Sequence, residues 1–105
     1  MEDIAVTDAV LRASETHQPV ALATVVRTRG SVPRRAGSRM VIDPERGMVG
    51  TIGGGCGEAD VILAARAVIE TGLPRLMRVE LMDSTDSWSP AVCGGVMEIF
   101  VEPVS

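Results

Sequence analysis

Hydrophobic residues recur at helical spacing in two stretches of the chain. Near the N-terminus the spacing predicts a helix that breaks at residues 17–19, and its apolar positions are Ile4, Ala5, Ala9, Val10 and Ala13. Later in the chain a second helix is predicted, with Gly72 and Pro74 as its stop, and its apolar positions are Val61, Ile62, Ala65, Val68 and Ile69. The pattern therefore predicts an N-terminal helix and a central helix.

Short apolar runs predict strands between the two helices. Residues 20–26 are continuously apolar and rich in β-branched side chains, which is typical of a central strand covered on both faces. Residues 40–42 and 48–52 flank a turn-forming cluster at residues 43–47. This arrangement predicts a β-hairpin.

Two more strands are predicted after the central helix. They cover residues 76–81 and 96–101, and Pro103 is expected to end the second. Residues 30–37 and 83–90 are expected to be loops, because they are polar or carry glycine and proline. The order predicts an α/β fold, a small mixed β-sheet with an N-terminal helix and a central helix that follows a glycine-rich turn.

Composition adds limits on size and stability. The chain has 105 residues, 46% of them hydrophobic and 23% charged, so residues 1–105 are expected to form a single domain. With one Trp, one Phe and no Tyr, the core must be built from aliphatic residues and Met. We expect a thin core, and with it modest stability or support from a partner.

The sequence shows no sign of export or membrane insertion. A basic n-region followed by an apolar segment is missing at the start, and no apolar run is long enough to cross a bilayer. A cytoplasmic protein that does not bind membranes is therefore expected. In that compartment the two cysteines, Cys56 and Cys93, are expected to be free thiols rather than a disulfide.

Charge is distributed unevenly along the chain. The formal net charge of -4 argues against nucleic-acid binding, which usually needs a basic face. Residues 27–39 nevertheless hold five arginines and no acidic residue, and these are Arg27, Arg29, Arg34, Arg35 and Arg39. All ten basic residues are Arg, which suits bidentate capture of phosphate or carboxylate, although an Arg-rich genomic composition explains the lack of Lys equally well.

The segment Gly53-Gly54-Gly55-Cys56-Gly57-Glu58 is predicted to be a strand-to-helix turn and the centre of the functional site. At such a turn the first N–H groups of the helix lack partners, and glycines let the backbone wrap an anion. The segment lacks the last glycine of the dinucleotide fingerprint and the Lys-Ser or Lys-Thr of a P-loop, so neither NAD nor ATP is predicted. A tight connection without a ligand is the structural alternative.

Two cysteines are candidate reactive or metal-binding residues. A thiol at a helix N-terminus, such as Cys56, has a lowered pKa, and the thiolate is the form that binds metals or attacks. Cys93, followed by Gly94, is a second thiol beside flexible backbone. Structural zinc is not expected from two Cys and one distant His. The structural alternatives are buried cysteines and, for Glu58, a carboxylate that only favours the helix dipole.

Three motifs stand in order along the chain, and together they resemble the N-terminal domain of the XdhC/CoxI family. The motifs are Gly30-Ser31-Val32-Pro33-Arg34 with Gly37 and Met40, then residues 50–58, then Cys93-Gly94-Gly95 with Glu102-Pro103, and the resemblance covers residues 20–103. It implies a molybdenum-cofactor chaperone for xanthine dehydrogenase and related hydroxylases. Such a protein binds the molybdopterin cofactor, supports its sulfuration with a cysteine desulfurase, and delivers it to the apo-hydroxylase. It transfers a cofactor and is not itself an enzyme.

The resemblance also implies a set of cofactor-binding residues. The phosphate is expected on the amides of residues 53–57 with Ser31 or Arg34, and Cys56 is the candidate molybdenum contact. The full set is Ser31, Arg34, Gly53, Gly54, Gly55, Cys56, Gly57, Glu58, Cys93 and Gly94.

This chain departs from the family pattern in two respects. Family members resemble Ser-Gly-Gly-Cys followed by an apolar residue and Glu, whereas Gly53 and Gly57 stand at those places here. Many members also carry a C-terminal Rossmann-like domain, and none is expected within these 105 residues. A homo-oligomer, or a partner that carries such a domain, is therefore implied.

Two other hypotheses remain open. In the first, Cys56 is a nucleophile that carries persulfide sulfur, which would require a base, and His17 is the only histidine. In the second, the domain is a ligand-free assembly module with Leu63 and Trp88 as contact residues.

Overall fold

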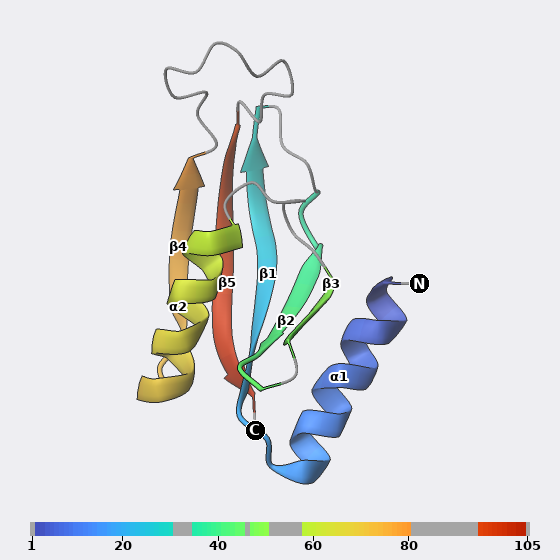
Figure 1. The fold of residues 1–105 in the computed structure, drawn as a ribbon. Coiled ribbons are helices and arrows are strands. Elements are labelled where there is room, and N and C mark those ends of the chain that lie inside the picture. Colours follow the sequence, from blue (N-terminus) through green and yellow to red (C-terminus); the bar gives the residue numbers. More distant parts are fainter. Residues whose placement is uncertain (1, 31–34, 46, 51–57, 81–94, 105) are drawn as a thin grey trace.

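The computed structural model describes residues 2–30, 35–45, 47–50, 58–80 and 95–104, and the structural statements below concern this part of the chain. It contains two helices and five strands (Figure 1). In chain order they are α1 (Glu2–Thr16), β1 (Val20–Arg29), β2 (Arg39–Asp43), β3 (Gly47–Gly50), α2 (Glu58–Thr71), β4 (Arg75–Glu80) and β5 (Val96–Val104).

The strands form one sheet in the order β3-β2-β1-β5-β4. The predicted α/β fold with an N-terminal and a central helix is confirmed. The sheet was expected to be mixed, but all its pairings are antiparallel. The reason is the position of β5, which lies between β1 and β4 and so separates two strands that run in the same direction.

β1 is the central strand, as its continuous apolar run predicts. Its side chains alternate between two hydrophobic clusters. Ala21, Ala23 and Val25 belong to the cluster beneath α2, whereas Val20 and Leu22 belong to the cluster beneath α1. The two helices therefore cover opposite faces of the sheet.

The α2 side holds the larger core. Four residues of α2 are buried there, namely Val61, Ala64, Ala65 and Val68. They pack on residues of four strands, among them Met40, Val79, Met97 and Ile99. Every buried hydrophobic side chain in the described ranges is aliphatic or Met, which agrees with the composition.

α1 covers its face of the sheet only in part. It packs mainly against β2 and β3 through Val6, Ala9, Val10 and Ala13. On the same face, no described helix lies over β4, where Leu76 is 59% exposed. α1 thus covers mainly β2 and β3 on one face of the sheet, and α2 covers mainly β1 and β5 on the other.

The ends of the helices follow from their sequence. α1 ends as predicted, since His17 has a positive φ of 58° and the N–H of Gln18 donates to the carbonyl oxygen of Ala13. Gly72, with φ 74°, ends α2, and its N–H donates to the carbonyl oxygen of Val68 at 2.8 Å. Both are helix ends that use a left-handed residue.

The strand β5 is longer than predicted, because it continues through Pro103 to Val104. Pro103 pairs with Ala21 of β1, whereas the ladder with β4 begins only at Val101. On the β4 side Pro103 therefore has no strand neighbour, and its missing N–H breaks no ladder hydrogen bond there. Proline is tolerated at such an edge position.

Candidate functional site

Strand directions bring the ends of three strands together at one end of the sheet. β1 ends at Arg29 and β4 ends at Glu80, and both of these residues pair with Val96, the first residue of β5. This end of the sheet, where Arg29, Val96 and Glu80 lie side by side, is called the motif end below; it is the upper end in Figure 1. In the chain, the motif that contains Ser31 and Arg34 follows β1 through Gly30, and Cys93-Gly94 comes just before Gly95 and β5.

The glycine-rich motif, residues 50–58, comes between β3 and α2 in the chain. β3 runs in the same direction as β1 and ends at Gly50, and α2 begins at Glu58. The prediction that residues 53–57 connect a strand to a helix therefore agrees with the elements on both sides. Glu58 is half-buried in the first turn of α2, where a carboxylate is favoured by the helix dipole.

Gly50 is required where the chain leaves β3. Its φ is 84°, and a Cβ there would lie 2.7 Å from the carbonyl oxygen of Arg39 and 2.8 Å from Cγ2 of Val6. A larger residue would clash with backbone of β2 as well as with α1. The entrance to the glycine-rich motif is thus tightly packed against two elements.

Among the predicted site residues, only Glu58 falls within the described part of the chain. Its proposed role stays a prediction. The others lie outside the described residues: Ser31, Arg34, Gly53, Gly54, Gly55, Cys56, Gly57, Cys93 and Gly94. Trp88 also lies outside them.

His17, the base that a nucleophilic Cys56 would need, lies at the other end of β1. It is exposed and comes just before Val20, whereas Gly30 and the first motif follow the opposite end of the same strand. A strand of ten residues is about 33 Å long at about 3.3 Å per residue. His17 is thus far from the end of β1 that leads into the first motif, and Cys56 lies outside the described residues, so the Cys-His pair stays a prediction.

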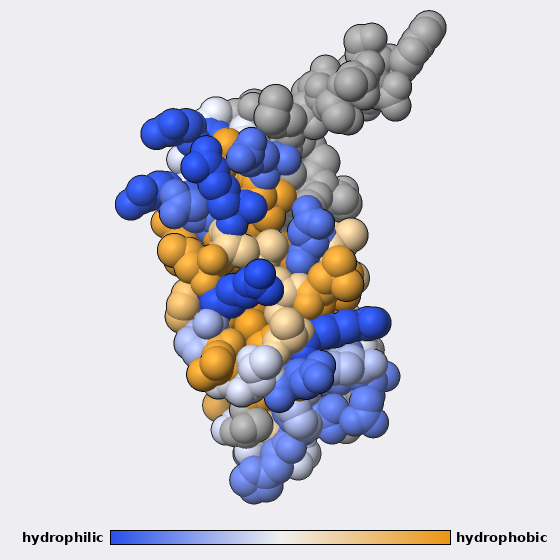
Figure 2. All heavy atoms as spheres, turned by 90° about the vertical axis from the view of Figure 1, so that its left-hand side faces the viewer, coloured by the Kyte–Doolittle hydropathy of each residue, from blue (hydrophilic) through white to orange (hydrophobic). Residues whose placement is uncertain are grey.

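Three arginines gather at the motif end, which the sequence pattern predicted only in part. Arg27 and Arg29 come from β1 and Arg78 from β4, and together with Glu98 of β5 they line a hollow of about 380 Å³. Nη1 of Arg27 lies 3.6 Å from Oε2 of Glu98. Figure 2, which looks onto the β4 edge, shows hydrophilic side chains gathered at the upper end of the molecule.

A β-bulge explains why these side chains share one face. Val25 pairs with Ile99 and Arg27 with Glu98, so that Val26 is an extra residue without a partner in the ladder. Glu98 lies on the face away from α2, since both Met97 and Ile99 belong to the core beneath α2. The bulge thereby moves Arg27 to that same face. Neither Arg78 nor Glu98 could be assigned to the site from sequence, because the strand register is needed to bring them together.

The charges in this cluster leave a positive excess. Besides the pair between Arg27 and Glu98, Nε of Arg78 lies 3.7 Å from Oε2 of Glu80. Among the described residues, three guanidinium groups thus lie beside two carboxylates, and all of these groups are partly open to solvent. Such a cluster can bind an anion, for which the Arg guanidinium is well suited.

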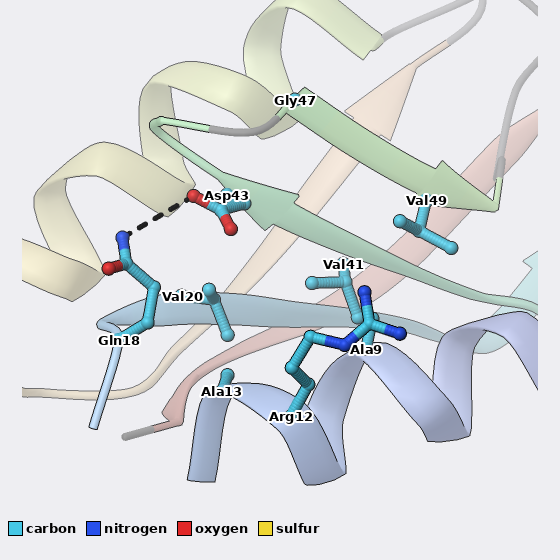
Figure 3. Close-up of a pocket in the computed structure, with 9 residues that line it drawn as sticks. All are labelled: Ala9, Arg12, Ala13, Gln18, Val20, Val41, Asp43, Gly47 and Val49. Carbon is cyan, nitrogen blue, oxygen red and sulfur yellow. Dashed lines mark hydrogen bonds between the residues drawn. The ribbon is translucent and has the colours of Figure 1, made fainter. Parts of the chain in front are cut away.

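A second hollow lies at the opposite end of the sheet, between α1 and the strands β2 and β3 (Figure 3). It has a volume of about 220 Å³ and an apolar floor of small residues, namely Ala9, Ala13, Val20, Val41 and Val49. At its rim the side-chain amide of Gln18 donates to Oε2 of Glu45 at 2.7 Å and points to Oδ1 of Asp43 at 3.5 Å. In Figure 3 the side chain of Arg12 projects from α1 toward β2 and β3.

The comparison with known proteins identifies the class of this α/β domain. The family model for the XdhC and CoxI family matches residues 13–80. The chain belongs to the XdhC and CoxI family. This confirms the resemblance that the three motifs carry.

Two curated relatives and one solved structure extend the comparison. The chain is 33% identical over 87 residues to the uncharacterized protein YqeB of Escherichia coli (strain K12), covering 83% of this chain and 16% of that protein. It is 30% identical over 93 residues to a probable xanthine dehydrogenase subunit of Bacillus subtilis (strain 168), covering 87% and 28%. A crystal structure of a xanthine dehydrogenase from Bacillus halodurans matches with a TM-score of 0.78 and 30% identity, covering 96% of this chain and 31% of that one.

These relatives are much longer than the chain. It spans less than a third of the length of each of the three proteins. Within the described residues, no helix is long and apolar enough to cross a bilayer.

Proposed function

We propose that this chain binds the molybdenum cofactor and helps to mature and insert it into a xanthine dehydrogenase-type hydroxylase. The observation that carries the proposal is the strand topology. β1 and β5 attach two of the family motifs to neighbouring positions at the motif end, and β3 points the third in the same direction. Segments that are far apart in sequence are thereby available to one ligand.

The charge at the motif end suits the phosphate of molybdopterin. Arg27, Arg29 and Arg78 surround a hollow next to the point where the first motif leaves β1. We propose that these guanidinium groups attract the phosphate, while the amides of residues 53–57 with Ser31 or Arg34 hold it. Attraction by exposed arginines should weaken as the salt concentration rises.

Cys56 and Cys93 are proposed to act near the metal. When bound, the cofactor supplies a molybdenum centre that accepts soft sulfur ligands. Cys56 is the proposed contact, because it follows the glycines just before α2 begins at Glu58. The chain would hold and orient the cofactor for delivery and would not itself turn over a substrate.

The proposed partners follow from the family. The named relatives point to a xanthine dehydrogenase-type hydroxylase as recipient. A cysteine desulfurase would supply the sulfur. A second copy of this chain, or a partner that carries a Rossmann-like domain, is a further proposed partner.

The test is cofactor analysis of the protein purified without oxygen from a host that makes molybdenum cofactor. We expect molybdenum and pterin to co-purify in equal amounts, and Cys56→Ser to retain much less of both. Arg12→Ala, at the opposite end of the sheet, is the matched control and should retain the wild-type amount. A wild-type protein free of both molybdenum and pterin would overturn the proposal, and equal retention by Cys56→Ser would remove the role of the cysteine.

A further inference from the structure

The strand β4 is an open edge of the sheet. It is last in the strand order and pairs only with β5 in the part of the chain that the structure describes. Alternate residues of an edge strand turn their N–H and C=O groups away from the sheet, where they can pair with another strand. β4 is thus able to accept one more strand.

A groove runs along this edge between β4 and α2. It has a volume of about 460 Å³ and carries apolar side chains that solvent reaches, since Leu63 of α2 is 65% exposed and Leu76 of β4 is 59% exposed. The residues that line it are Asp60, Leu63, Ala64, Arg75, Leu76, Met77 and Arg78. In Figure 2 hydrophobic side chains are exposed on this side of the molecule, below the hydrophilic cluster.

The edge offers apolar contacts on both faces of the sheet. Met77 packs toward the core beneath α2, on the side of Leu63. Leu76 points to the opposite face, where it pairs with the half-buried Phe100 of β5. A strand added to β4 would send alternate side chains to the two faces. One set would reach Leu63 and Met77, and the other would reach Leu76 and Phe100.

Charges at the edge limit which strand can be added. Arg75 and Arg78 are both exposed, and charged side chains on an edge strand normally prevent indiscriminate pairing. Arg78 lies 3.7 Å from Glu80 and Asp60 also lines the groove, whereas Arg75 forms no ion pair within the described residues. Opposite charges placed across two strands stabilise their pairing, while like charges destabilise it. Arg75 therefore favours an incoming segment that carries an acidic residue beside it.

A second copy of β4 does not meet this requirement. When two copies of β4 pair antiparallel and symmetrically, the residues that face each other must lie on the same face of the sheet. Two such registers pair five residues of each strand. In the register centred on Arg78, this arginine faces its own copy. In the register centred on Met77, Arg75 faces Val79 and Arg78 faces Leu76. Neither register places a carboxylate opposite an arginine.

We propose that the groove between α2 and β4 binds an extended segment of a partner protein, in which apolar and acidic residues alternate, by adding it to the sheet as a sixth strand. Main-chain pairing with β4 provides affinity, and the apolar and charged side chains provide selectivity, as in other strand-addition complexes. The groove shares only one described residue with the hollow at the motif end, namely Arg78, and otherwise uses none of the proposed cofactor-binding residues.

The first test is selection from a library of random linear ten-residue peptides displayed on phage, with the full chain as target. We expect the enriched peptides to alternate apolar residues with Asp or Glu. Enrichment of basic peptides, enrichment without alternation, or failure to enrich any peptide would overturn the proposal.

The second test uses the enriched peptide to ask how it binds. We expect Leu63→Asp to weaken binding at least tenfold and Arg75→Glu to shift the preference to a version with Lys in place of the acidic residues. Leu11→Asp, at an exposed apolar position of α1, is the matched control and should bind as the wild type does. Circular dichroism should show each variant folded. A variant at Leu63 or Arg75 that is folded and binds normally would place the peptide elsewhere and overturn the proposal.

Backbone methylation separates strand addition from side-chain binding alone. Two versions of the peptide would be N-methylated at alternate residues, so that each removes one of the two sets of N–H donors. Only the set that faces β4 should lose binding, by tenfold or more. Equal binding of both versions would show that no strand is added.

Discussion

The two ends of the sheet differ in how their polar groups are used. At the end opposite the motifs, Asp43, Gln18 and Glu45 bond to one another and hold the turn between β2 and β3 next to the end of α1. At the motif end, Arg27, Arg29 and Arg78 line a hollow and outnumber the carboxylates beside them in the described part of the chain. The first arrangement satisfies polar groups internally, whereas the second leaves an excess of positive charge.

Under the proposed function, this difference predicts that substitutions can change stability and cofactor binding separately. The end that holds Gln18, Asp43 and Glu45 is called the closed end. Substitutions there should lower the free energy of unfolding and leave cofactor binding unchanged. Substitutions of the arginines at the motif end should do the reverse. Gly50 joins the two roles, because it packs against α1 and also leads into the glycine-rich motif.

The largest expected effect is that of Gly50→Ala. A non-glycine residue at φ 84° costs about 1–2 kcal/mol, and the added Cβ would lie 2.7 Å from the Arg39 carbonyl oxygen, which forces a shift that costs about 1–3 kcal/mol more. We expect the free energy of unfolding, measured with urea, to fall by about 3 kcal/mol. Gly37→Ala is the matched control, since its φ is 97° but a Cβ would meet nothing within 4 Å. Equal losses for the two variants would show that the close contact at Gly50 is unimportant.

Arg29→Glu should give the next largest effect, on binding alone. It reverses one of three positive charges around the hollow, and we expect about tenfold weaker cofactor binding, equivalent to about 1.4 kcal/mol. The free energy of unfolding should change by less than about 0.5 kcal/mol, because the side chain is exposed. Anaerobic titration with molybdopterin measures the first quantity. Arg12→Glu, beside the other hollow, should bind as the wild type does, and a matching loss there would mean that net charge alone matters.

Much of the fold could be predicted from local patterns. Helical spacing of apolar residues gave both helices, and the unbroken apolar run at residues 20–26 marked the central strand. Strand direction could not be predicted, because it depends on β5 entering the sheet between β1 and β4. The continuation of β5 through Pro103 was missed for a related reason, since the proline is tolerated only because β4 starts further along.

The sequence predicted the motifs of the candidate site but only part of its arginine cluster. The motifs pointed to residues 30–34, 50–58 and 93–95, and the topology supports their convergence, although most of these residues lie outside the described part of the chain. Sequence alone gave Arg27 and Arg29 as members of a basic run. The sequence could not predict that Arg78 and Glu98 lie beside these two arginines, because this grouping depends on the bulge at Val26 and on the register of β5.

Asp43→Ala tests the closed end. Oδ1 of Asp43 accepts a hydrogen bond of 2.8 Å from the N–H of Glu45, and its loss should lower the free energy of unfolding by about 1 kcal/mol. Urea denaturation measures this change, and Asp8→Ala at an exposed position of α1 should change it by less than about 0.5 kcal/mol. Cofactor retention should be the same in both variants and the wild type. Reduced retention in Asp43→Ala would contradict the separation of the two ends.

The smallest expected effect is that of Glu98→Gln, and it has the opposite sign for binding. The Glu98 side chain is 31% exposed and that of Arg27 is 76% exposed, so their ion pair at 3.6 Å should contribute less than about 1 kcal/mol to stability. Removing the carboxylate leaves the guanidinium of Arg27 without this counter-charge, and we expect two- to threefold tighter cofactor binding, equivalent to about 0.5 kcal/mol. The gain should disappear in the double variant Arg27→Gln/Glu98→Gln and shrink at high salt. Unchanged or weaker binding by the single variant would show that Glu98 orients Arg27 rather than competing with the ligand for it.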